Sequence, residues 1–224
     1  MPRRPFITFE GSEGCGKSTQ VQRLAARLER NGVPLLVTRE PGGTAIGETI
    51  RELLQFAPHG VGMTAKTELL LFEASRSQLV HEIIKPALER GLCVIADRFF
   101  DSTTVYQGAA RKLDGQIVEQ LNAFAVGDCR PDLTFILDID LATAQSRMQR
   151  TVRRPDRMEQ QSTEFYEQVR QAYRQLAARE PDRIVLMDGA QPTGKIDIEI
   201  WEMISSRFPG LAMNPQSANR NPQS

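Results

Sequence analysis

The stretch Gly11-Ser12-Glu13-Gly14-Cys15-Gly16-Lys17-Ser18-Thr19 decides the fold of this 224-residue chain. Its part up to Ser18 matches the pattern G-x-x-x-x-G-K-[ST] and follows an apolar run of strand length, Phe6 to Phe9. After it, Val21, Leu24 and Leu28 recur at helical spacing. Glycines allow such a loop to turn its backbone N–H groups toward phosphate oxygens, and the following helix adds its positive end. The pattern predicts a nucleotide-binding loop, from Gly11 to Thr19, between a strand and a helix.

Further chemistry is expected beside this loop. Lys17 would bridge the β- and γ-phosphates of a bound nucleoside triphosphate, and the Ser18 hydroxyl would ligate Mg²⁺. Asp97 and Arg98 follow another apolar run and therefore lie at the carboxyl end of a predicted strand, where ligands of open parallel sheets collect. Asp97 is a second candidate magnesium ligand, and the guanidinium of Arg98 suits a phosphate.

The remaining chain alternates apolar runs with helical patterns, which predicts an α/β fold with a parallel sheet. The runs are continuous, as in strands buried on both faces. Strand and helix alternate about five times, so right-handed crossovers are expected. The runs lie at residues 6–9, 34–37, 92–96, 133–137 and 184–187.

Composition excludes several classes of protein. Lys and Arg number 28, as do Asp and Glu, so the formal net charge is zero. This argues against binding nucleic acid or anionic membrane by bulk charge. The three cysteines, Cys15, Cys93 and Cys129, have no metal-ligand spacing, and the N-terminus lacks the apolar stretch of a signal peptide. We therefore expect a cytoplasmic protein without a membrane segment.

The chain resembles the bacterial thymidylate kinases, which belong to the P-loop nucleoside monophosphate kinases, over about residues 6–208. Five motifs in order carry the resemblance: FEGSEGCGKST (9–19), TREPGGT (38–44), LLLFEASRSQ (69–78), DRFFDSTTVYQG (97–108) and RPDLTFILD (130–138). The resemblance implies a three-layer α/β/α fold with five parallel strands in the order 2-3-1-4-5. It implies a homodimer that transfers phosphate from ATP to dTMP with Mg²⁺, in dTTP biosynthesis.

The resemblance also implies roles for the acceptor residues. Phe72 would stack on the thymine ring, and Arg76, one helical turn later, would donate to a thymine carbonyl. Arg51 and Arg98 would hold the monophosphate. The base edge would be contacted by Thr103 and Gln107, and the sugar by Tyr106.

The loop from Gly11 to Thr19 contains no arginine. In this it resembles the bacterial subtype of the family, in which the catalytic arginine comes from a small helical lid. The irregular basic segment at about 147–161 would be this lid, with Arg153 as the first candidate and Arg147, Arg150 and Arg154 as rivals. We thus expect one domain, 1–208, and a disordered tail, 209–224, rich in Pro, Asn, Gln and Ser.

Departures from the family pattern concern pocket shape. Phe99 stands where the family often has Tyr or His, and Val105 where Ala is commoner. Two alternatives stay open: another nucleoside monophosphate kinase, and a nucleotide-dependent switch or assembly ATPase that has no small acceptor. An acceptor panel separates the first, and acceptor-independent hydrolysis would favour the second.

Overall fold

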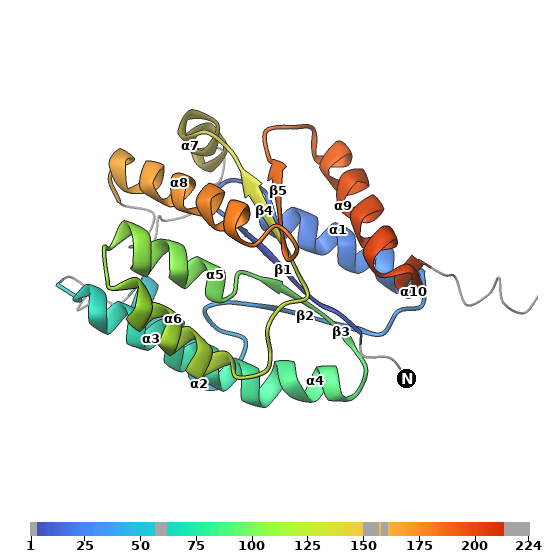
Figure 1. Cartoon of the computed structure of the whole chain (residues 1–224), viewed down its shortest axis with the longest axis horizontal. Helices are drawn as coiled ribbons and strands as arrows, with labels where there is room; N and C mark the ends of the chain where they lie inside the picture. Colours follow the sequence, from blue (N-terminus) through green and yellow to red (C-terminus); the bar gives the residue numbers. More distant parts are fainter. Residues whose placement is uncertain (1–3, 57–61, 150–156, 158–160, 213–224) are drawn as a thin grey trace, which may run out of the picture.

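A five-stranded parallel sheet forms the centre of the molecule (Figure 1). The computed structural model describes residues 4–56, 62–149, 157 and 161–212. The strand order is β2-β3-β1-β4-β5, which confirms the predicted order. The strands are β1 (Phe6–Gly11), β2 (Leu35–Arg39), β3 (Cys93–Asp97), β4 (Leu133–Asp138) and β5 (Ile184–Asp188).

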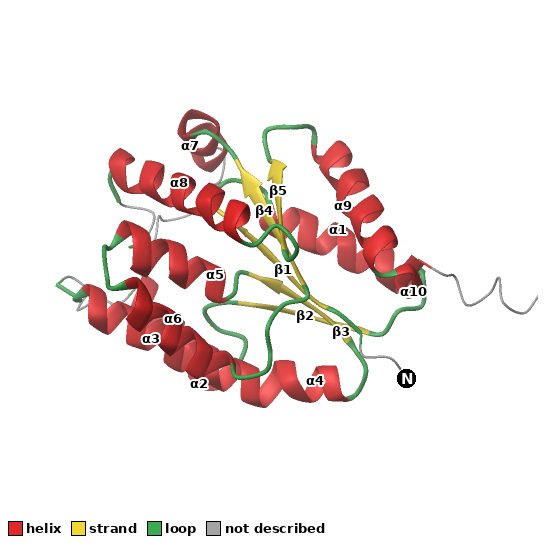
Figure 2. Cartoon of the chain, viewed as in Figure 1, coloured by secondary structure: helices red, strands yellow, loops and turns green. Residues whose placement is uncertain are grey.

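Helices connect the strands and cover both faces of the sheet (Figure 2). Two segments, η2 and η3, are π-helical, a form often found at functional sites. The connecting elements are α1 (Lys17–Arg30), α2 (Ala45–Gln55), α3 (Ala65–Leu79), η2 (Val80–Ile84), α4 (Lys85–Glu89), α5 (Phe100–Thr103), η3 (Thr104–Ala110), α6 (Gly115–Val126), α7 (Leu141–Gln149), α8 (Thr163–Arg179), α9 (Thr193–Arg207) and α10 (Pro209–Ala212).

The layers follow from which apolar side chains each helix buries. On one face, α1 and α9 pack against the sheet, and the predicted stripe of Val21, Leu24 and Leu28 lies within this core. On the other face, α8 and η3 form a second core with Ile136 and Ile184, while η2 and α4 form a third. The predicted α/β/α arrangement is therefore confirmed. No helix in the described ranges is long and apolar enough to span a bilayer.

The predicted start of the disordered tail at residue 209 is wrong by four residues. Residues Pro209–Ala212 form α10, which packs against α9. Leu211 is buried in the core on the α1 side, and its carbonyl oxygen accepts a hydrogen bond of 3.2 Å from the Asn31 amide. The buried Leu211 side chain and this hydrogen bond connect the turn to the core. Residues 213–224 lie outside the described residues.

Strand register brings the functional motifs to one edge of the sheet. Phe9 of β1 pairs with Asp97 of β3, and Gly11 pairs with Leu137 of β4. The carboxyl ends of these three central strands therefore meet where the predicted loop begins, which is where open α/β sheets bind ligands.

Candidate active site

The loop between β1 and α1 has the backbone that its glycines predict. Gly11 (φ 136°) and Gly16 (φ 98°) adopt conformations that side chains disfavour. A Cβ on Gly11 would lie 2.5 Å from the Leu137 carbonyl oxygen, so this position also lacks space. The Lys17 ammonium is buried and donates to the carbonyl oxygens of Gly11 (3.1 Å) and Ser12 (2.9 Å). The lysine is thus held across the mouth of the loop.

Ser18 and Asp97 meet beside the loop, as their positions at the sheet edge predict. The Ser18 hydroxyl donates to Asp97 Oδ2 at 2.5 Å. Mg²⁺ usually takes one or two protein oxygens together with water and substrate phosphates, so this hydroxyl and carboxylate fit it. In the described part of the chain, no group of three or more His, Cys, Asp or Glu side chains could hold a metal by itself. Ser18 and Asp97 are therefore the side chains that would hold a magnesium ion beside the loop.

Arg98 occupies a left-handed turn directly after β3, with φ of 72°. Its guanidinium donates to the Gly11 carbonyl oxygen (3.0 Å) and the Ser102 hydroxyl (3.1 Å), and forms an ion pair with Glu13. Burial opposes the charge, but Glu13 and other nearby groups raise the pKa of Arg98 above its usual value. The arginine therefore stays cationic at the junction between loop and sheet.

Glu10 binds the residues that follow Arg98 in the turn after β3. Its carboxyl group is fully buried and accepts hydrogen bonds from the backbone N–H of Phe99 (2.8 Å) and from the hydroxyl groups of Ser102 (2.6 Å) and Tyr173 (2.8 Å). Burial, reinforced by the negative charge of Asp101, raises the pKa of Glu10. Glu10 was not among the predicted site residues, because its only local signal is an acidic side chain directly after an apolar run.

A cavity beside Arg98 is built from the predicted acceptor residues. It is lined by Glu13, Pro41, Gln55, Phe72, Arg98, Ser102, Thr103, Tyr106 and Gln107. The hydroxyl groups of Thr103 and Tyr106 are buried and have no hydrogen-bond partner within the described residues. Because buried polar groups are normally paired, these two hydroxyl groups indicate that the cavity receives a polar ligand.

A larger groove adjoins this cavity and runs over the loop. The loop residues Glu13 to Thr19, together with Asp97, Arg51 and Arg147, line it. The groove and the cavity share Glu13, Pro41, Gln55 and Arg98 in their walls. A ligand bound in the groove and a ligand bound in the cavity would therefore meet at Arg98. Arg51, whose guanidinium donates to the Pro41 carbonyl oxygen at 2.9 Å, stands on the groove side.

Arg76, which is expected to donate to a thymine carbonyl, is bound mostly by other side chains of the protein. It is 1% exposed and does not line the cavity. Its guanidinium binds both carboxylate oxygens of Glu40 (shortest contact 2.6 Å), Glu73 (2.8 Å) and the Asn122 side chain (3.1 Å). These contacts use four of its five N–H groups, so the predicted contact with a thymine carbonyl would rest on one N–H and stays a prediction.

Of the four candidate lid arginines, the described residues include Arg147. Arg153, Arg150 and Arg154 lie outside the described residues. Arg147 is in α7, and its guanidinium donates to the Gly189 carbonyl oxygen at 3.0 Å, between the nucleotide loop and the connection from β5 to α9. This position on the groove favours contact with the nucleotide over contact with the acceptor.

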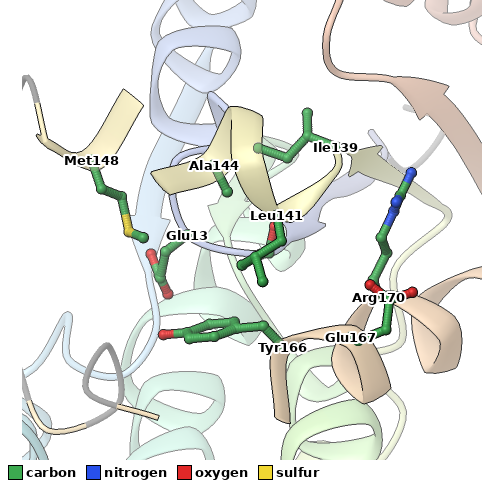
Figure 3. Close-up of a pocket in the computed structure, with 9 residues that line it drawn as sticks. Glu13, Ile139, Leu141, Ala144, Met148, Tyr166, Glu167 and Arg170 are labelled. Carbon is green, nitrogen blue, oxygen red and sulfur yellow. The ribbon is translucent and has the colours of Figure 1, made fainter. Parts of the chain in front are cut away.

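A small hollow separates the loop from α7 and α8, as Figure 3 shows. Glu13 points into it between Met148 of α7 and Tyr166 of α8. Glu13 also lines the cavity and the groove. The loop glutamate therefore stands where all three spaces converge, next to the helices that flank residues 150–160.

Comparison with known proteins assigns the family. The family model for thymidylate kinase matches residues 9–200. The thymidylate kinase of Afipia carboxidovorans is 46% identical over 92% of this chain and 91% of its own, and that of Deinococcus radiodurans is 45% identical over 92% and 99%. The crystal structure of the Ehrlichia chaffeensis thymidylate kinase superposes with a TM-score of 0.72 at 36% identity, covering 91% of this chain and 99% of that one. This chain therefore belongs to the thymidylate kinase family.

Proposed function

We propose that this protein transfers the γ-phosphoryl group of ATP to dTMP, forming dTDP and ADP. The observation that carries the proposal is the shared wall of the two spaces, where Arg98 stands between the loop groove and the cavity of Phe72, Thr103, Tyr106 and Gln107. Membership in the thymidylate kinase family supports dTMP as the acceptor. ATP would occupy the groove, and dTMP the cavity.

The transfer needs no general base in this arrangement. The acceptor phosphate has a second pKa of about 6, so it is mostly dianionic at neutral pH and attacks directly. The protein must align two anionic groups and offset their repulsion. Lys17 lies on the loop side and Arg98 on the acceptor side, and both are cationic donors held by several hydrogen bonds. Each would exchange protein carbonyl oxygens for phosphate oxygens when substrates bind.

Two further parts of the machinery belong to this proposal. Ser18 and Asp97 would hold Mg²⁺, which supplies charge neutralisation at the transferred phosphate. Arg153, in the segment at about 147–161, would add a cation at the transferred group, and this segment would act as a lid on one kinase domain. Arg51 would assist Arg98 with the monophosphate, since it lines the groove beside Pro41.

A cytoplasmic homodimer is the assembly we propose. Neighbouring helices α3 and α6 expose large apolar side chains, with Leu70 56%, Ile117 53% and Phe124 84% exposed. Such a cluster on adjacent helices favours contact with a second copy. Sedimentation of the purified protein at micromolar concentration would give twice the monomer mass. A monomer under these conditions would contradict the assembly without affecting the reaction.

A coupled ADP-release assay with a panel of nucleoside monophosphates tests the reaction. We expect strong preference for dTMP over AMP and dCMP, and release of ADP that depends on the acceptor. Lys17→Ala should abolish transfer while circular dichroism stays unchanged. Preference for another acceptor would reassign the substrate. Hydrolysis of ATP that ignores every acceptor would instead favour the switch or assembly ATPase.

A further inference from the structure

Glu68 of α3 is a buried carboxylate outside the motifs of the active site. It is 1% exposed, and its carboxylate oxygens contact donors of Gln107, Arg111 and Arg157. Oε1 accepts from Gln107 Nε2 at 2.8 Å and from Arg111 Nε at 3.3 Å. Oε2 forms an ion pair of 2.6 Å with Arg157 Nη2. Gln107 lines the acceptor cavity, so Glu68 reaches that cavity through one amide.

Gln107 and the two arginines together favour the ionised form of Glu68. Burial favours the neutral acid, but the hydrogen bond from Gln107 and the charges of Arg111 and Arg157 outweigh it and lower the pKa of Glu68. An ionised carboxylate accepts hydrogen bonds and donates none. Glu68 must therefore face the NH₂ group of Gln107, and the flipped amide, which would set two oxygens against each other, is excluded.

This orientation matters because an amide is ambiguous. A flip of the Gln107 side chain exchanges its carbonyl oxygen and its NH₂ group with almost no change of shape. The N3 edge of thymine or uracil offers an N–H, whereas N3 of cytosine is an acceptor beside an amino group. A freely rotating amide could pair with either edge. An amide fixed by Glu68 presents its carbonyl oxygen to the cavity, which pairs with the N3–H of thymine or uracil and meets the N3 lone pair of cytosine unfavourably.

We propose that Glu68 is a positioning residue that makes the acceptor site selective for N3–H pyrimidines by fixing the amide of Gln107. This rests on the proposed function, in which the cavity holds the acceptor base. Arg157 also connects Glu68 to the end of α2. The Nε of Arg157 donates to the Leu54 carbonyl oxygen at 2.9 Å, and the backbone N–H of Arg157 donates to the Gln55 carbonyl oxygen at 3.2 Å. Both acceptors lie at the end of α2. Gln55 itself lines the cavity, so α2 and α3 are joined at the base pocket.

The test compares dTMP, dUMP and dCMP as acceptors for the wild type and Glu68→Gln, with Glu180→Gln as matched control. Glu180 also pairs with an arginine, Arg183 at 2.8 Å, and among the described residues it has no ion pair with a residue that lines the cavity. A neutral amide at position 68 accepts either face of Gln107. We expect kcat/KM for dTMP and dUMP to fall about tenfold together, since one oriented hydrogen bond is at stake. The value for dCMP should stay constant or rise, and the KM for ATP should not change.

Gln107→Ala separates positioning from general damage to the fold. If Glu68 acts through Gln107, the two effects should not add. In a protein that already carries Gln107→Ala, Glu68→Gln should then change the ratio of kcat/KM for dTMP to kcat/KM for dCMP by less than twofold. Glu68→Asp keeps the charge but shortens the reach, and it should lose the same selectivity if Glu68→Gln does not fold. An equal loss for all three acceptors, or an unchanged ratio in Glu68→Gln when Gln107→Ala loses it, would overturn the inference alone. A wild type that does not prefer dTMP would overturn the proposed function as well.

Discussion

Replacing Arg98 with alanine and with glycine separates its backbone from its guanidinium. Arg98 has φ of 72°, a left-handed conformation that costs a residue with a Cβ roughly 1–2 kcal/mol. Glycine pays no such cost, but it gains about 0.4–1 kcal/mol of conformational freedom in the unfolded chain. The difference leaves Arg98→Gly about 0.8 kcal/mol more stable than Arg98→Ala at the midpoints of these ranges, and at most about 1.6 kcal/mol more stable. At most helix or strand positions the order is the reverse.

Activity should not distinguish the two variants. Both lose the donor that contacts Gly11 and Ser102 and lines the cavity and the groove. Loss of one charged donor at a reacting group typically costs about 10²–10³ in kcat. The two variants should therefore show equal turnover while differing in stability.

Urea unfolding followed by circular dichroism measures the stability difference, and the coupled assay measures turnover. A glycine variant that is less stable than the alanine variant would show that the turn after β3 stores no strain. Turnover that differs by tenfold between them would show that the turn, rather than the guanidinium, carries the catalytic effect.

Three other perturbations follow from the same structure. Gly11→Ala should weaken ATP binding more than Gly16→Ala in an ATP titration, because its Cβ meets the Leu137 carbonyl oxygen at 2.5 Å, whereas that of Gly16 meets nothing within 4 Å; equal effects would mean that the loop relaxes. Arg76→Met should destabilise the fold by roughly 3–5 kcal/mol in urea, more at pH 8 than at pH 6, because two buried carboxyl groups lose their cation; a loss below 1 kcal/mol would contradict this. Burial raises the pKa of Glu40 to about 7, against the opposing charge of Arg76, so the folded state holds a proton that the unfolded chain releases near pH 4.5. The stability that this proton contributes is full below pH 4.5 and is lost as the pH rises through about 7. Glu40→Gln should make the urea midpoint of unfolding less dependent on pH over this range. A pH dependence equal to that of the wild type would refute this.

The sequence predicted those parts of the molecule that local patterns specify. Apolar runs at β1 to β5, the loop from Gly11 to Ser18 and the stripe of α1 all depend on neighbours in the chain, so their prediction needed no tertiary information. Asp97 and Arg98 were predicted because parallel strands end at a common edge.

The parts that were missed depend on partners far away in the sequence. Glu10 meets Tyr173 across 163 positions, and Glu68 meets Gln107 across 39, so no local pattern marks either carboxylate as functional. Arg76 was expected to donate to the acceptor base, because helical spacing places it on the same face as Phe72 but does not reveal its protein partners, Glu40 and Asn122. The helical turn at 209–212 was also missed, because Leu211 packs against core residues that are distant in the sequence.

Arg98 joins the two proposed substrate sites, and a crystal structure with dTMP and a non-hydrolysable ATP analogue tests this most directly. We predict the triphosphate in the loop from Gly11 to Ser18, the thymine ring against Phe72 with its N3 facing Gln107, and the monophosphate within hydrogen-bond distance of Arg98. A complex in which dTMP lies outside this cavity, or in which its phosphate makes no contact with Arg98, would contradict the account.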